Sequence, residues 1–583
     1  MKKTFQKIAA ITLPWSVCSG SHERKILPYN ESYNYILILI IGFAFLFNTA
    51  NAQVQWKWAK NAGNSISRSV AADNYGNIYA VGEFVDPSIL FDTISLTGNG
   101  GGDAYIVKYN SDGNVLWAKG IGGADIDRAR SVCTDPYGNI YVAGEFWSDT
   151  IVIDTFVLSK TDYGFDVFIA KYDGNGNVLW AKSAEGNYID YVTGIAANDQ
   201  GEVYIIGSIW GNYIVFDTII LYNSGNIDMY IAKYDIAGNA VWAQNGIGND
   251  QDEVYSISVD NGGNVLIGGS FRSDSISFGN KTLINSSDTL CFGDLCYDAF
   301  LVKFDENGIV EWAVSSTGKD WDETYGVVTD TSGNIYTTGI FISDTIYFDT
   351  LSLVNHTTFD VYISKYNTDG IVQWVTGFGG NSTDYVEDMA IDNNGNIYIG
   401  GGFDSDSLVI GNDVFVNKGS NDIYVAKYDN DGNNIWAAYG GGNDWDLCLG
   451  VTVDLLSNVY LAGYFSSNII SFDTINLNKM GNQDMFIAKI GKQNTYIEEN
   501  AKKETLKVYP NPFNDLVHIE FDNQKAEKHV LDVYTTDGKL VLSINDITTG
   551  HVVIERKNLT GGMYFFRLWN NRQVVAAGKL IIE

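Results

Sequence analysis

The sequence has little proline, cysteine and histidine, and few positive charges. Its 583 residues include 6 Pro, 5 Cys and 5 His, whereas Gly (61) and aromatic residues (14 %) are abundant. No cysteine pair has zinc-site spacing with histidines. Lys and Arg number 37 against 70 Asp and Glu, a formal net charge of −33. A chain this acidic repels nucleic acid and anionic lipid, so we expect neither as a partner.

Long apolar runs are confined to one place near the beginning of the chain. Tyr35–Phe47 is apolar, and Ala50-Asn51-Ala52 follows as an A-x-A cleavage signal. The alternative is a membrane anchor, but the run is short for a full span. We expect residues 1–52 to be an export segment that is removed. We then expect no transmembrane span in the mature protein.

Export permits a disulfide between Cys291 and Cys296, which lie five positions apart in "CFGDLC". A pair of unlinked thiols is the open alternative. Cys133 and Cys448 fall in strand-like runs and are expected to be buried thiols.

An internal repeat of about 60 residues dominates the chain. Its clearest marker is a series of aligned tryptophans: Trp58, Trp117, Trp180, Trp242, Trp312, Trp374 and Trp436. Each repeat contains four strand-like runs joined by Asx-rich turns with glycine, which are strong hairpin signals. Four strands per repeat are typical of a β-propeller blade.

We expect the mature chain to begin with the end of a repeat, because Val54–Lys60 matches the fourth strand only. The second-strand pattern "GNIYVAGEF" occurs seven times, and after Ile490 the expected fourth strand is missing. We therefore expect an all-β, seven-bladed propeller in which Val54–Lys60 pairs with Asp484–Ile490 and closes the ring. An open β-solenoid is the alternative, but it needs no half-repeat at each end.

Residues that recur in every repeat are expected to serve the blade. An aspartate opens each third strand (Asp103, Asp166, Asp228, Asp298, Asp360, Asp422, Asp484), and a lysine follows five positions later (Lys108, Lys171, Lys233, Lys303, Lys365, Lys427, Lys489). We expect these charges to pair between blades, because half-buried charges need partners. The turns at Asp173–Asn177 and Asp429–Asn433 lack the full spacing of a calcium loop and are interpreted as hairpin turns.

A further set of aspartates lies in the loop before each first strand, in six of the seven repeats. They are Asp127, Asp190, Asp252, Asp322, Asp384 and Asp446, with Ser65 in the first repeat. One interpretation is the capping of backbone N–H groups. The other is a ring of oxygen ligands for a metal ion at the channel mouth, which leaves calcium open as a ligand; no cofactor is required.

Four tryptophans break the repeat pattern. Trp147 and Trp210 follow second strands, whereas Trp321 and Trp445 precede first strands. Propeller topology places these positions, the aspartates and the "FDT" hairpins on one face. Aromatic rings beside carboxylates bind sugars by stacking and hydrogen bonding, so the four tryptophans are candidate ligand-binding residues. The alternative is that they pack the hairpins down.

Enzyme chemistry is not favoured by the sequence. The repeats contain one histidine, His356, and four arginines, Arg68, Arg128, Arg130 and Arg272. No nucleophile and base stand out as a pair, and Asp/Glu pairs are too numerous to indicate glycoside hydrolysis. A sialidase-type arginine cluster is hard to build from four arginines.

The end of the chain differs in composition and reads as a small β-sandwich. Its motifs include Tyr509-Pro510-Asn511-Pro512, "LTGGMY" at 559–564 and Gly578-Lys579. This tail resembles the C-terminal sorting domain of the type IX secretion system of Bacteroidota. The resemblance implies contact with that secretion machinery and passage across the outer membrane. The tail is then usually cleaved, and the protein is released or attached to the cell surface.

The repeats are similar to the SBBP-type β-propeller family, on patterns such as "DVFIAKYDGNGNVLWAK". The resemblance supports the fold and hardly the function. We expect a propeller over residues 53–497, a linker over 498–504 and a sorting domain over 505–583. The predicted function is non-catalytic binding or adhesion at an extracellular glycan or protein. A structural surface or matrix protein, or a glycan-active hydrolase or lyase, are the alternatives.

Overall fold

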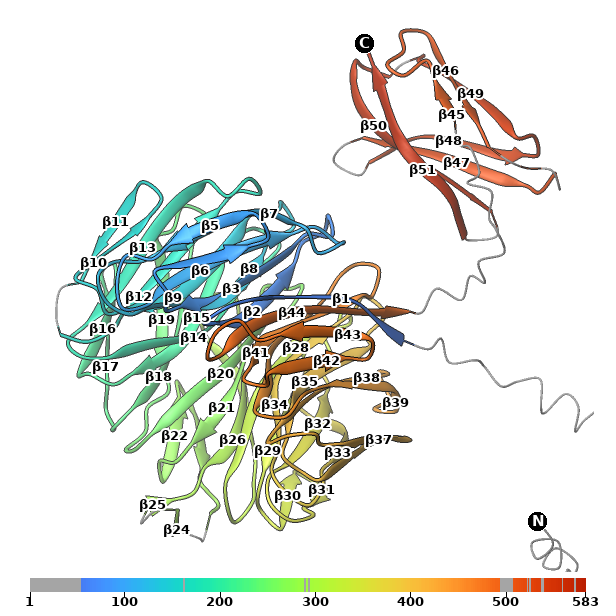
Figure 1. Ribbon diagram of the computed structural model, residues 1–583. Helices are drawn as coiled ribbons and strands as arrows, with labels where there is room; N and C mark the ends of the chain where they lie inside the picture. Colours follow the sequence, from blue (N-terminus) through green and yellow to red (C-terminus); the bar gives the residue numbers. More distant parts are fainter. Residues whose placement is uncertain are drawn as a thin grey trace, which may run out of the picture. The chain divides into compact units, whose positions relative to one another are not determined.

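Every regular element in the described residues is a β-strand (Figure 1). The computed structural model describes residues 54–160, 163–287, 290–291, 294–492, 507–521, 523, 526–535, 539–557, 559–570 and 573–583. The chain divides into two compact units, residues 1–493 and 494–583. The expected export segment and linker lie outside the described residues.

The repeats form antiparallel sheets in which the four strands follow one another in chain order. The first strands are β2 (Ser65–Ala72), β8 (Asp127–Thr134), β14 (Asp190–Ala197), β20 (Asp252–Val259), β28 (Asp322–Thr329), β34 (Asp384–Ile391) and β40 (Asp446–Val453). The second strands are β3 (Ile78–Phe84), β9 (Ile140–Phe146), β15 (Val203–Ile209), β21 (Val265–Phe271), β29 (Ile335–Phe341), β35 (Ile397–Phe403) and β41 (Val459–Phe465).

The third strands are β6 (Asp103–Tyr109), β12 (Asp166–Tyr172), β18 (Asp228–Tyr234), β26 (Asp298–Phe304), β32 (Asp360–Tyr366), β38 (Asp422–Tyr428) and β44 (Asp484–Lys492). The fourth strands are β7 (Val115–Ile121), β13 (Val178–Gly186), β19 (Ala240–Asn245), β27 (Val310–Ser316), β33 (Val372–Phe378) and β39 (Asn434–Gly440). Second and third strands are buried almost throughout, because neighbouring sheets cover both of their faces.

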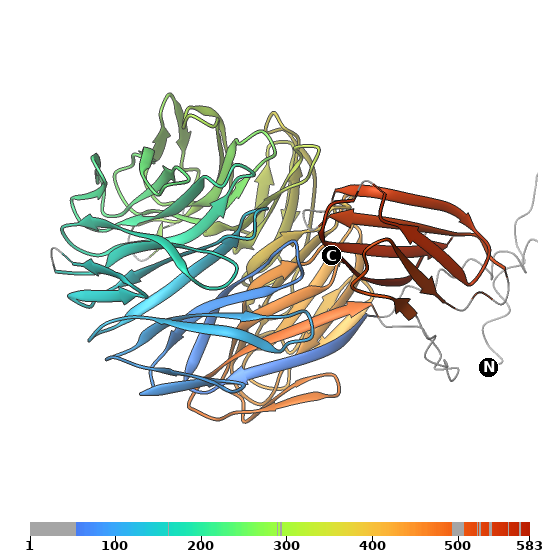
Figure 2. The same ribbon diagram turned by 90° about the horizontal axis from the view of Figure 1, so that it is seen from above.

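The last sheet takes its outer strand from the beginning of the chain. β1 (Val54–Ala62) pairs antiparallel with β44, with Val54 opposite Lys492 and Ala62 opposite Met485. The dark-blue β1 lies beside the orange β44 in both views (Figures 1 and 2). Trp56 anchors the strand, because its ring packs 4.8 Å from the ring of Phe472.

Each first strand contacts the first strand of the next sheet, and β2 also contacts β40. The repeated tryptophans join neighbouring sheets at the other side. Trp117, for example, donates its indole N–H to the carbonyl of Gly174, in the turn between the third and fourth strands of the following sheet. The predicted tryptophan ladder is therefore part of the packing between sheets.

Short hairpins follow the second strands and pack against the fourth strands of the sheets. They are β4 (Ser88–Phe91) with β5 (Ile94–Thr97), β10 (Thr150–Ile153) with β11 (Phe156–Ser159), β16 (Tyr213–Phe216) with β17 (Ile219–Tyr222), β22 (Ser275–Phe278) with β23 (Lys281–Ile284), β30 (Thr345–Phe348) with β31 (Leu351–Val354), β36 (Ser407–Ile410) with β37 (Asp413–Val416), and β42 (Ile469–Phe472) with β43 (Ile475–Asn478). The expected hairpin turns at 173–177 and 429–433 are present, each built around an aspartate that accepts backbone N–H groups.

The expected pairing of the repeated aspartates with the repeated lysines is wrong. Each third strand crosses its sheet, so its aspartate and lysine lie at opposite edges. Four of the lysines donate to backbone carbonyls of the next sheet, as Lys108 does at Gly174 (2.8 Å). Ion pairs with carboxylates outside the repeated aspartate set are formed by Lys233, Lys303 and Lys427. Several also lie over a tyrosine ring, such as Lys171 over Tyr141 at 4.9 Å.

A small insertion with β24 (Leu290–Cys291) and β25 (Asp294–Leu295) carries a further pair of cysteines, Cys291 at the end of β24 and Cys296 directly after β25. Cys296 is disulfide-bonded, whereas Cys133 and Cys448 are free thiols. The side chain of Cys291, the predicted partner, lies outside the described residues.

The tail folds as two sheets around one core. One sheet contains β45 (Lys507–Tyr509), β46 (Leu516–Glu520) and β49 (His551–Glu555); the other contains β47 (His529–Thr535), β48 (Leu540–Ile547), β50 (Gly562–Asn570) and β51 (Gln573–Ile582). Val517 and Ile519 from the first sheet share a buried cluster with Leu531 and Leu568 from the second. This is the small β-sandwich that the sequence predicts.

Candidate functional site

The beginnings of the first strands and the ends of the second strands lie at one edge of every sheet. The backbone hydrogen bonds show this directly, since Trp147 N–H donates to Ile126 and Ile342 N–H donates to Trp321. The same bond joins Trp210 to Ile189 and Ser466 to Trp445. All four off-pattern tryptophans therefore occupy equivalent edges, as the sequence predicts.

Each first strand bulges at the same repeat position. The pairing with the second strand skips one residue, which is Arg68, Arg130, Thr193, Tyr255, Tyr325, Glu387 or Leu449 in the seven sheets. A glycine of the second strand faces the residue before each bulge. A Cβ at Gly82 would lie 1.9 Å from the carbonyl oxygen of Ile66, so this close approach requires glycine.

The seven bulge residues line one cavity of about 340 Å³. Tyr191, Val192, Ser208, Trp210 and Glu253 complete its wall. Its size is at the low end of ligand pockets, which span roughly 300–1,000 Å³. A larger groove of about 720 Å³ lies elsewhere, between β1 and β39, and includes the repeated ladder residue Trp436. The cavity is the better candidate, because its lining differs from repeat to repeat.

Arginines form one side of the cavity. Arg68 donates to Glu83 through Nε and Nη2, and Arg130 donates to Glu145 in the same way. Arg128 lies 3.6 Å from the same Glu145 carboxylate. Glu145 is fully buried, so these ion pairs hold the guanidinium groups of Arg68 and Arg130 in place at the cavity wall.

Tyrosines and glutamates form the other side. The rings of Tyr255 and Tyr325 stack 4.9 Å apart with an interplanar angle of 6°. Both phenol groups donate to Glu323, which lies buried behind them. Tyr255 also donates to Glu253 (3.2 Å), which reaches the cavity.

Glu387 is the third glutamate on this side and points at the cavity from β34. Burial, followed by the nearby charges of Asp388 and Glu323, raises the pKa of Glu387 to about 8. Asp388 accepts the backbone N–H of Val451 (2.7 Å) and so ties β34 to the next sheet. Glu387 has no hydrogen bond or ion pair within the part of the chain that the structure describes.

Of the four candidate tryptophans, only Trp210 lines the cavity, and its side chain is 40 % exposed. The other three are half-buried and pack on aromatic neighbours. Trp147 packs against Phe165 (4.8 Å), Trp321 against Tyr297 (5.0 Å) and Trp445 against Tyr385 (6.2 Å). For these three, the geometry matches the packing alternative that the sequence left open.

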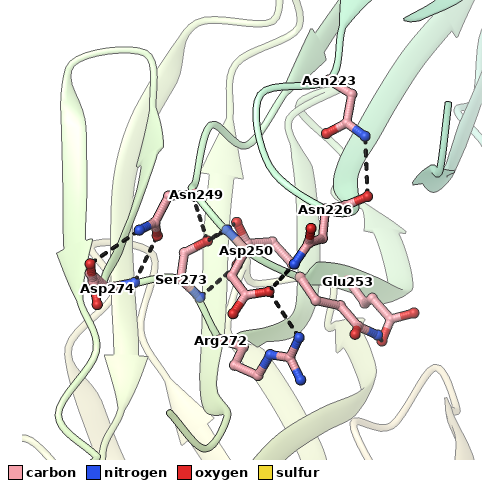
Figure 3. A network of polar contacts seen from close by, with 10 residues as sticks. Asn223, Asn226, Asn249, Asp250, Glu253, Arg272, Ser273 and Asp274 are labelled. Carbon is pink, nitrogen blue, oxygen red and sulfur yellow. Dashed lines mark hydrogen bonds and ion pairs between the residues drawn. The ribbon is translucent and has the colours of Figure 1, made fainter. Parts of the chain in front are cut away.

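The loops of the third and fourth repeats form a polar network (Figure 3). In it Asn223 donates to the carbonyls of Ile209 and Gly211, the residues on either side of Trp210. Arg272, which occupies the repeat position of Trp147 and Trp210, donates to Asp250 (2.8 Å), and Asn226 donates to the same carboxylate (2.6 Å). Asn249 and Asp274 bond to each other beside them. The network fixes the loop that leads into Glu253.

The six loop aspartates are fully buried, and five of them, all except Asp190, accept a hydrogen bond from a serine of their own sheet. Asp127 accepts the Ser148 hydroxyl and the Gly123 N–H (2.8 and 2.7 Å). Equivalent serines bind Asp252, Asp322, Asp384 and Asp446; at Asp190 the equivalent residue is Gly211. Among the described residues no group of three or more His, Cys, Asp or Glu could hold a metal ion. The structure thus does not bring the predicted ligand ring together, and the contacts of the five aspartates other than Asp190 are those of capping.

The sequence analysis missed the bulge residues. The signal was available in the first strands, where "SISRSV" and "DRARSV" align with "DEVYSI" and "DYVEDM". The position after the strand's third residue carries charged, aromatic and aliphatic side chains, whereas the third residue itself is always small or β-branched. Arg68 and Arg130, which looked too sparse to cluster, meet at one cavity because their strands are adjacent.

The tail also brings distant motif residues together. The Asn511 side chain donates to the carbonyl of Lys579 (2.8 Å) and accepts the N–H of Ile581 (2.7 Å). Tyr509, Pro510, Pro512 and Lys579 are exposed, so the predicted sorting motif forms one surface with Gly578 beside it.

Comparison with protein families decides the nature of this tail. Residues 507–583 match the sequence model described as "Secretion system C-terminal sorting domain". The chain carries a type IX secretion sorting domain. It is therefore a secreted or cell-surface protein. Residues 373–401 match the SBBP model, described as "Beta-propeller repeat", which agrees with the predicted family of the repeats.

Two curated relatives are similar in part. An uncharacterized WD repeat-containing protein of Acanthamoeba polyphaga mimivirus is 24 % identical over 446 residues, covering 62 % of this chain and 32 % of that protein. Regulatory protein FlaEY of Caulobacter vibrioides is 25 % identical over 175 residues, covering 29 % and 18 %. The chain thus spans about a third or less of the length of these relatives.

Solved structures resemble the fold only distantly. Sqt1 from Chaetomium thermophilum is 7 % identical with a TM-score of 0.38, covering 76 % of this chain and 99 % of that one. A puromycin hydrolase mutant is 11 % identical with a TM-score of 0.35, covering 80 % and 59 %. These likenesses carry no argument about activity. Within the described residues there is no helix long and apolar enough to cross a membrane.

Proposed function

We propose that residues 53–497 form a seven-bladed propeller ring that β1 closes. The support is the pairing of β1 with β44 together with the contact between β2 and β40, which joins the first repeat to the last. The linker (498–504) and the sorting domain (505–583) complete the organisation, and residues 1–52 are a cleaved export segment. The mature protein is then released or attached at the cell surface.

The propeller is a non-catalytic binding protein that recognises an extracellular glycan or protein at the face holding the cavity. One observation carries this proposal. Seven positions that are equivalent by repeat, and that meet at one cavity, hold arginine, threonine, tyrosine, glutamate and leucine. Trp210 adds an exposed ring at the rim, which suits stacking on a sugar or on a side chain.

A glycan-active hydrolase is the second candidate. It is favoured by two carboxyl groups, Glu253 and Glu387, that reach the same cavity. Glycoside hydrolysis needs such a pair, one of them protonated, and the raised pKa of Glu387 fits an acid. Turnover of a bound glycan by the purified chain would establish this candidate, and loss of turnover in both Glu253→Gln and Glu387→Gln would assign it to the cavity.

The test of binding is a screen of the purified full chain on glycan and extracellular-protein panels. Any hit is titrated by tryptophan fluorescence. We expect Trp210→Ala to weaken binding at least tenfold, because it removes the exposed ring at the cavity rim. Trp436→Ala is the matched control, since Trp436 lies on β39 in the separate outer groove. Equal losses in the two variants, or no ligand in either panel, would favour a structural surface or matrix protein.

A further inference from the structure

The cationic side of the cavity is already compensated. Arg68 is paired with Glu83, and Arg128 and Arg130 share Glu145. The guanidinium groups therefore retain about one unbalanced positive charge among them. An anionic ligand would have to compete with buried carboxylates that already bind the arginines.

The anionic side is not compensated. Glu253, Glu323 and Glu387 lie on consecutive sheets, and none forms an ion pair with Lys or Arg within the described residues. Glu323 is 3 % exposed and is held by neutral donors only, namely Tyr255, Tyr325 and Ser270. The whole chain adds to this local charge, with a formal net charge of −33. The cavity as a whole therefore favours a positive charge.

Aromatic rings border the same region. The stacked pair Tyr255 and Tyr325 stands beside Glu253 and Glu387, and Trp210 and Tyr191 continue the wall in an edge-to-face pair (5.7 Å). Carboxylates combined with aromatic faces are the groups that bind organic ammonium ions, through charge and through cation–π contacts. A bare metal ion would instead prefer a shell of oxygen ligands.

Ser208 and Glu387 line the cavity and make no side-chain hydrogen bond within the described residues. Ser208 is 3 % exposed. A buried hydroxyl without such a bond in a cavity wall is suited to a hydrogen bond with a ligand.

We propose that the cavity binds a ligand through a protonated amine, which lies between Glu253 and Glu387 while Ser208 and Arg68 hydrogen-bond to neighbouring oxygen atoms. This inference rests on the proposed binding function and names its ligand chemistry. Two sources present such a group: an amino sugar, which adds a ring for Trp210 and hydroxyls for the polar wall, and a lysine side chain of an extracellular protein.

Binding of the amine displaces a proton. The pKa of Glu387 is about 8 in the free protein, so at pH 6.5 its carboxyl group is mostly neutral. The titratable groups that interact with it are all neutral or acidic: Asp388, Tyr385, Glu323, Tyr325, Tyr424, Cys448 and Tyr464. An ammonium ion beside Glu387 favours the carboxylate and lowers its pKa, so the proton passes to the buffer.

The experiment is calorimetric titration of the full chain at pH 6.5 in two buffers of different ionisation enthalpy. The probes are glucosamine, N-acetylglucosamine, glucuronate, Nα-acetyl-lysine amide and calcium chloride. We expect saturable binding of glucosamine or the lysine amide with release of close to one proton. N-acetylglucosamine, which lacks the charge, is expected to bind at least tenfold more weakly. A preference for glucosamine or for the lysine amide distinguishes the two sources.

Two variants make the test specific to the site. Glu387→Gln should weaken amine binding at least tenfold and abolish the proton release. Glu306→Gln is the matched control, because Glu306 is exposed in the turn after β26, at the edge of the sheet away from the cavity. It should leave both quantities unchanged.

Several results would overturn the inference. The first is that glucuronate or N-acetylglucosamine binds more tightly than glucosamine. The second is that calcium binds and Glu387→Gln abolishes this binding. The third is that an amine binds without release of a proton. If no amine binds but another glycan or protein binds in a manner lost in Trp210→Ala, the amine chemistry is wrong and the binding function stands. If nothing binds in either experiment, both are wrong.

Discussion

Asp190 is an exception among the six loop aspartates. The other five accept a hydrogen bond from a serine, whereas Gly211 occupies that position in the third repeat. Asp190 is fully buried, and neither of its carboxylate oxygens has a hydrogen-bond partner in the described part of the chain. Burial and the neighbouring charge of Asp166 raise the pKa of Asp190 to about 8. The ionised side chain is therefore a cost at this position and not a stabilising cap.

This difference predicts the effect of an isosteric substitution. In the parent chain the folded pKa exceeds the unfolded one, so stability falls as pH rises from about 4 to 8. Asparagine does not titrate. We expect Asp190→Asn to gain stability relative to the parent as pH rises. The difference in free energy of unfolding between variant and parent should be larger at pH 8.5 than at pH 5 by on the order of 2 kcal/mol. Urea unfolding at the two pH values measures it.

Asp127→Asn is the control for this prediction. The introduced amide would keep the size of the side chain but would lose acceptor capacity for Ser148 and Gly123, so we expect this variant to be destabilised by about 1 kcal/mol at pH 5. If both variants shift stability alike, then the serine contact does not distinguish the two positions.

The sequence predicts repeated residues well and unrepeated ones poorly. The loop aspartates were correctly placed at one edge of the sheets because repetition fixes their position, and the capping alternative was reasoned from the same regularity. The role of Arg68, Arg130 and Glu387 could not be read in this way. Arginine stands at this position in two repeats and glutamate in one, and only the bulge directs all three side chains into one cavity.

At the scale of elements, β1 is the segment whose partner is farthest away in the chain. It completes the last sheet across more than four hundred residues, with Trp56 buried against Phe472. Lys60 and Trp58 also bond to the first repeat, at Asp92 and at the carbonyl of Ser111. The backbone of β1 is nevertheless paired only with β44 in the described part of the chain. The change in unfolding free energy caused by a substitution in β1 therefore measures the stability of the sheet that contains both ends of the repeat array.

We expect Trp56→Ala to lower the free energy of unfolding by about 3 kcal/mol, because it removes a buried aromatic side chain from the core of the last sheet. Gln55→Ala is the neighbouring control, since Gln55 is exposed, and should change it by less than about 0.5 kcal/mol. Urea unfolding followed by circular dichroism gives both values. If Trp56→Ala removes structure only near the amino terminus and leaves the free energy of unfolding of the full chain unchanged, then β1 does not stabilise the repeat array.

Elements were predicted from the sequence more reliably than the contacts between them. The strand pattern, the partner of β1 and the tail sandwich follow from periodicity and from missing strands. The expected Asp–Lys pairs failed, because spacing along a strand does not tell which edge of the sheet a side chain reaches. The hairpins were expected on the cavity face, yet none of their described residues lines the cavity; their apolar residues, such as Ile151 and Phe91, direct them against the outer strands.

At the scale of the whole molecule, buried carboxyl groups set the response to pH. Burial, partly opposed by hydrogen bonds, raises the pKa of Asp127 and Asp298 to about 6 and that of Asp252 and Asp384 to about 7. Burial also raises the pKa of Asp446 to about 7. All of these groups bind protons more tightly in the folded chain than in the unfolded one.

The sign of the effect follows from linkage. Where the folded state holds more protons, the free energy of unfolding falls as pH rises. We expect the propeller to be more stable near pH 5 than at pH 8.5, with the loss spread between about pH 4 and 8. Thermal and urea unfolding across this range test it, and the relief of charge repulsion in an acidic chain acts in the same direction. Stability that is constant or increases towards pH 8.5 would contradict the prediction.

The course of β44 also determines how the protein is presented to its surroundings. The strand starts at Asp484, at the cavity edge, and ends at Lys492, at the opposite edge, where Val54 pairs with it. The chain therefore leaves the last sheet at the edge opposite the cavity, so a ligand at the cavity and the segment that follows Lys492 meet this sheet at opposite edges.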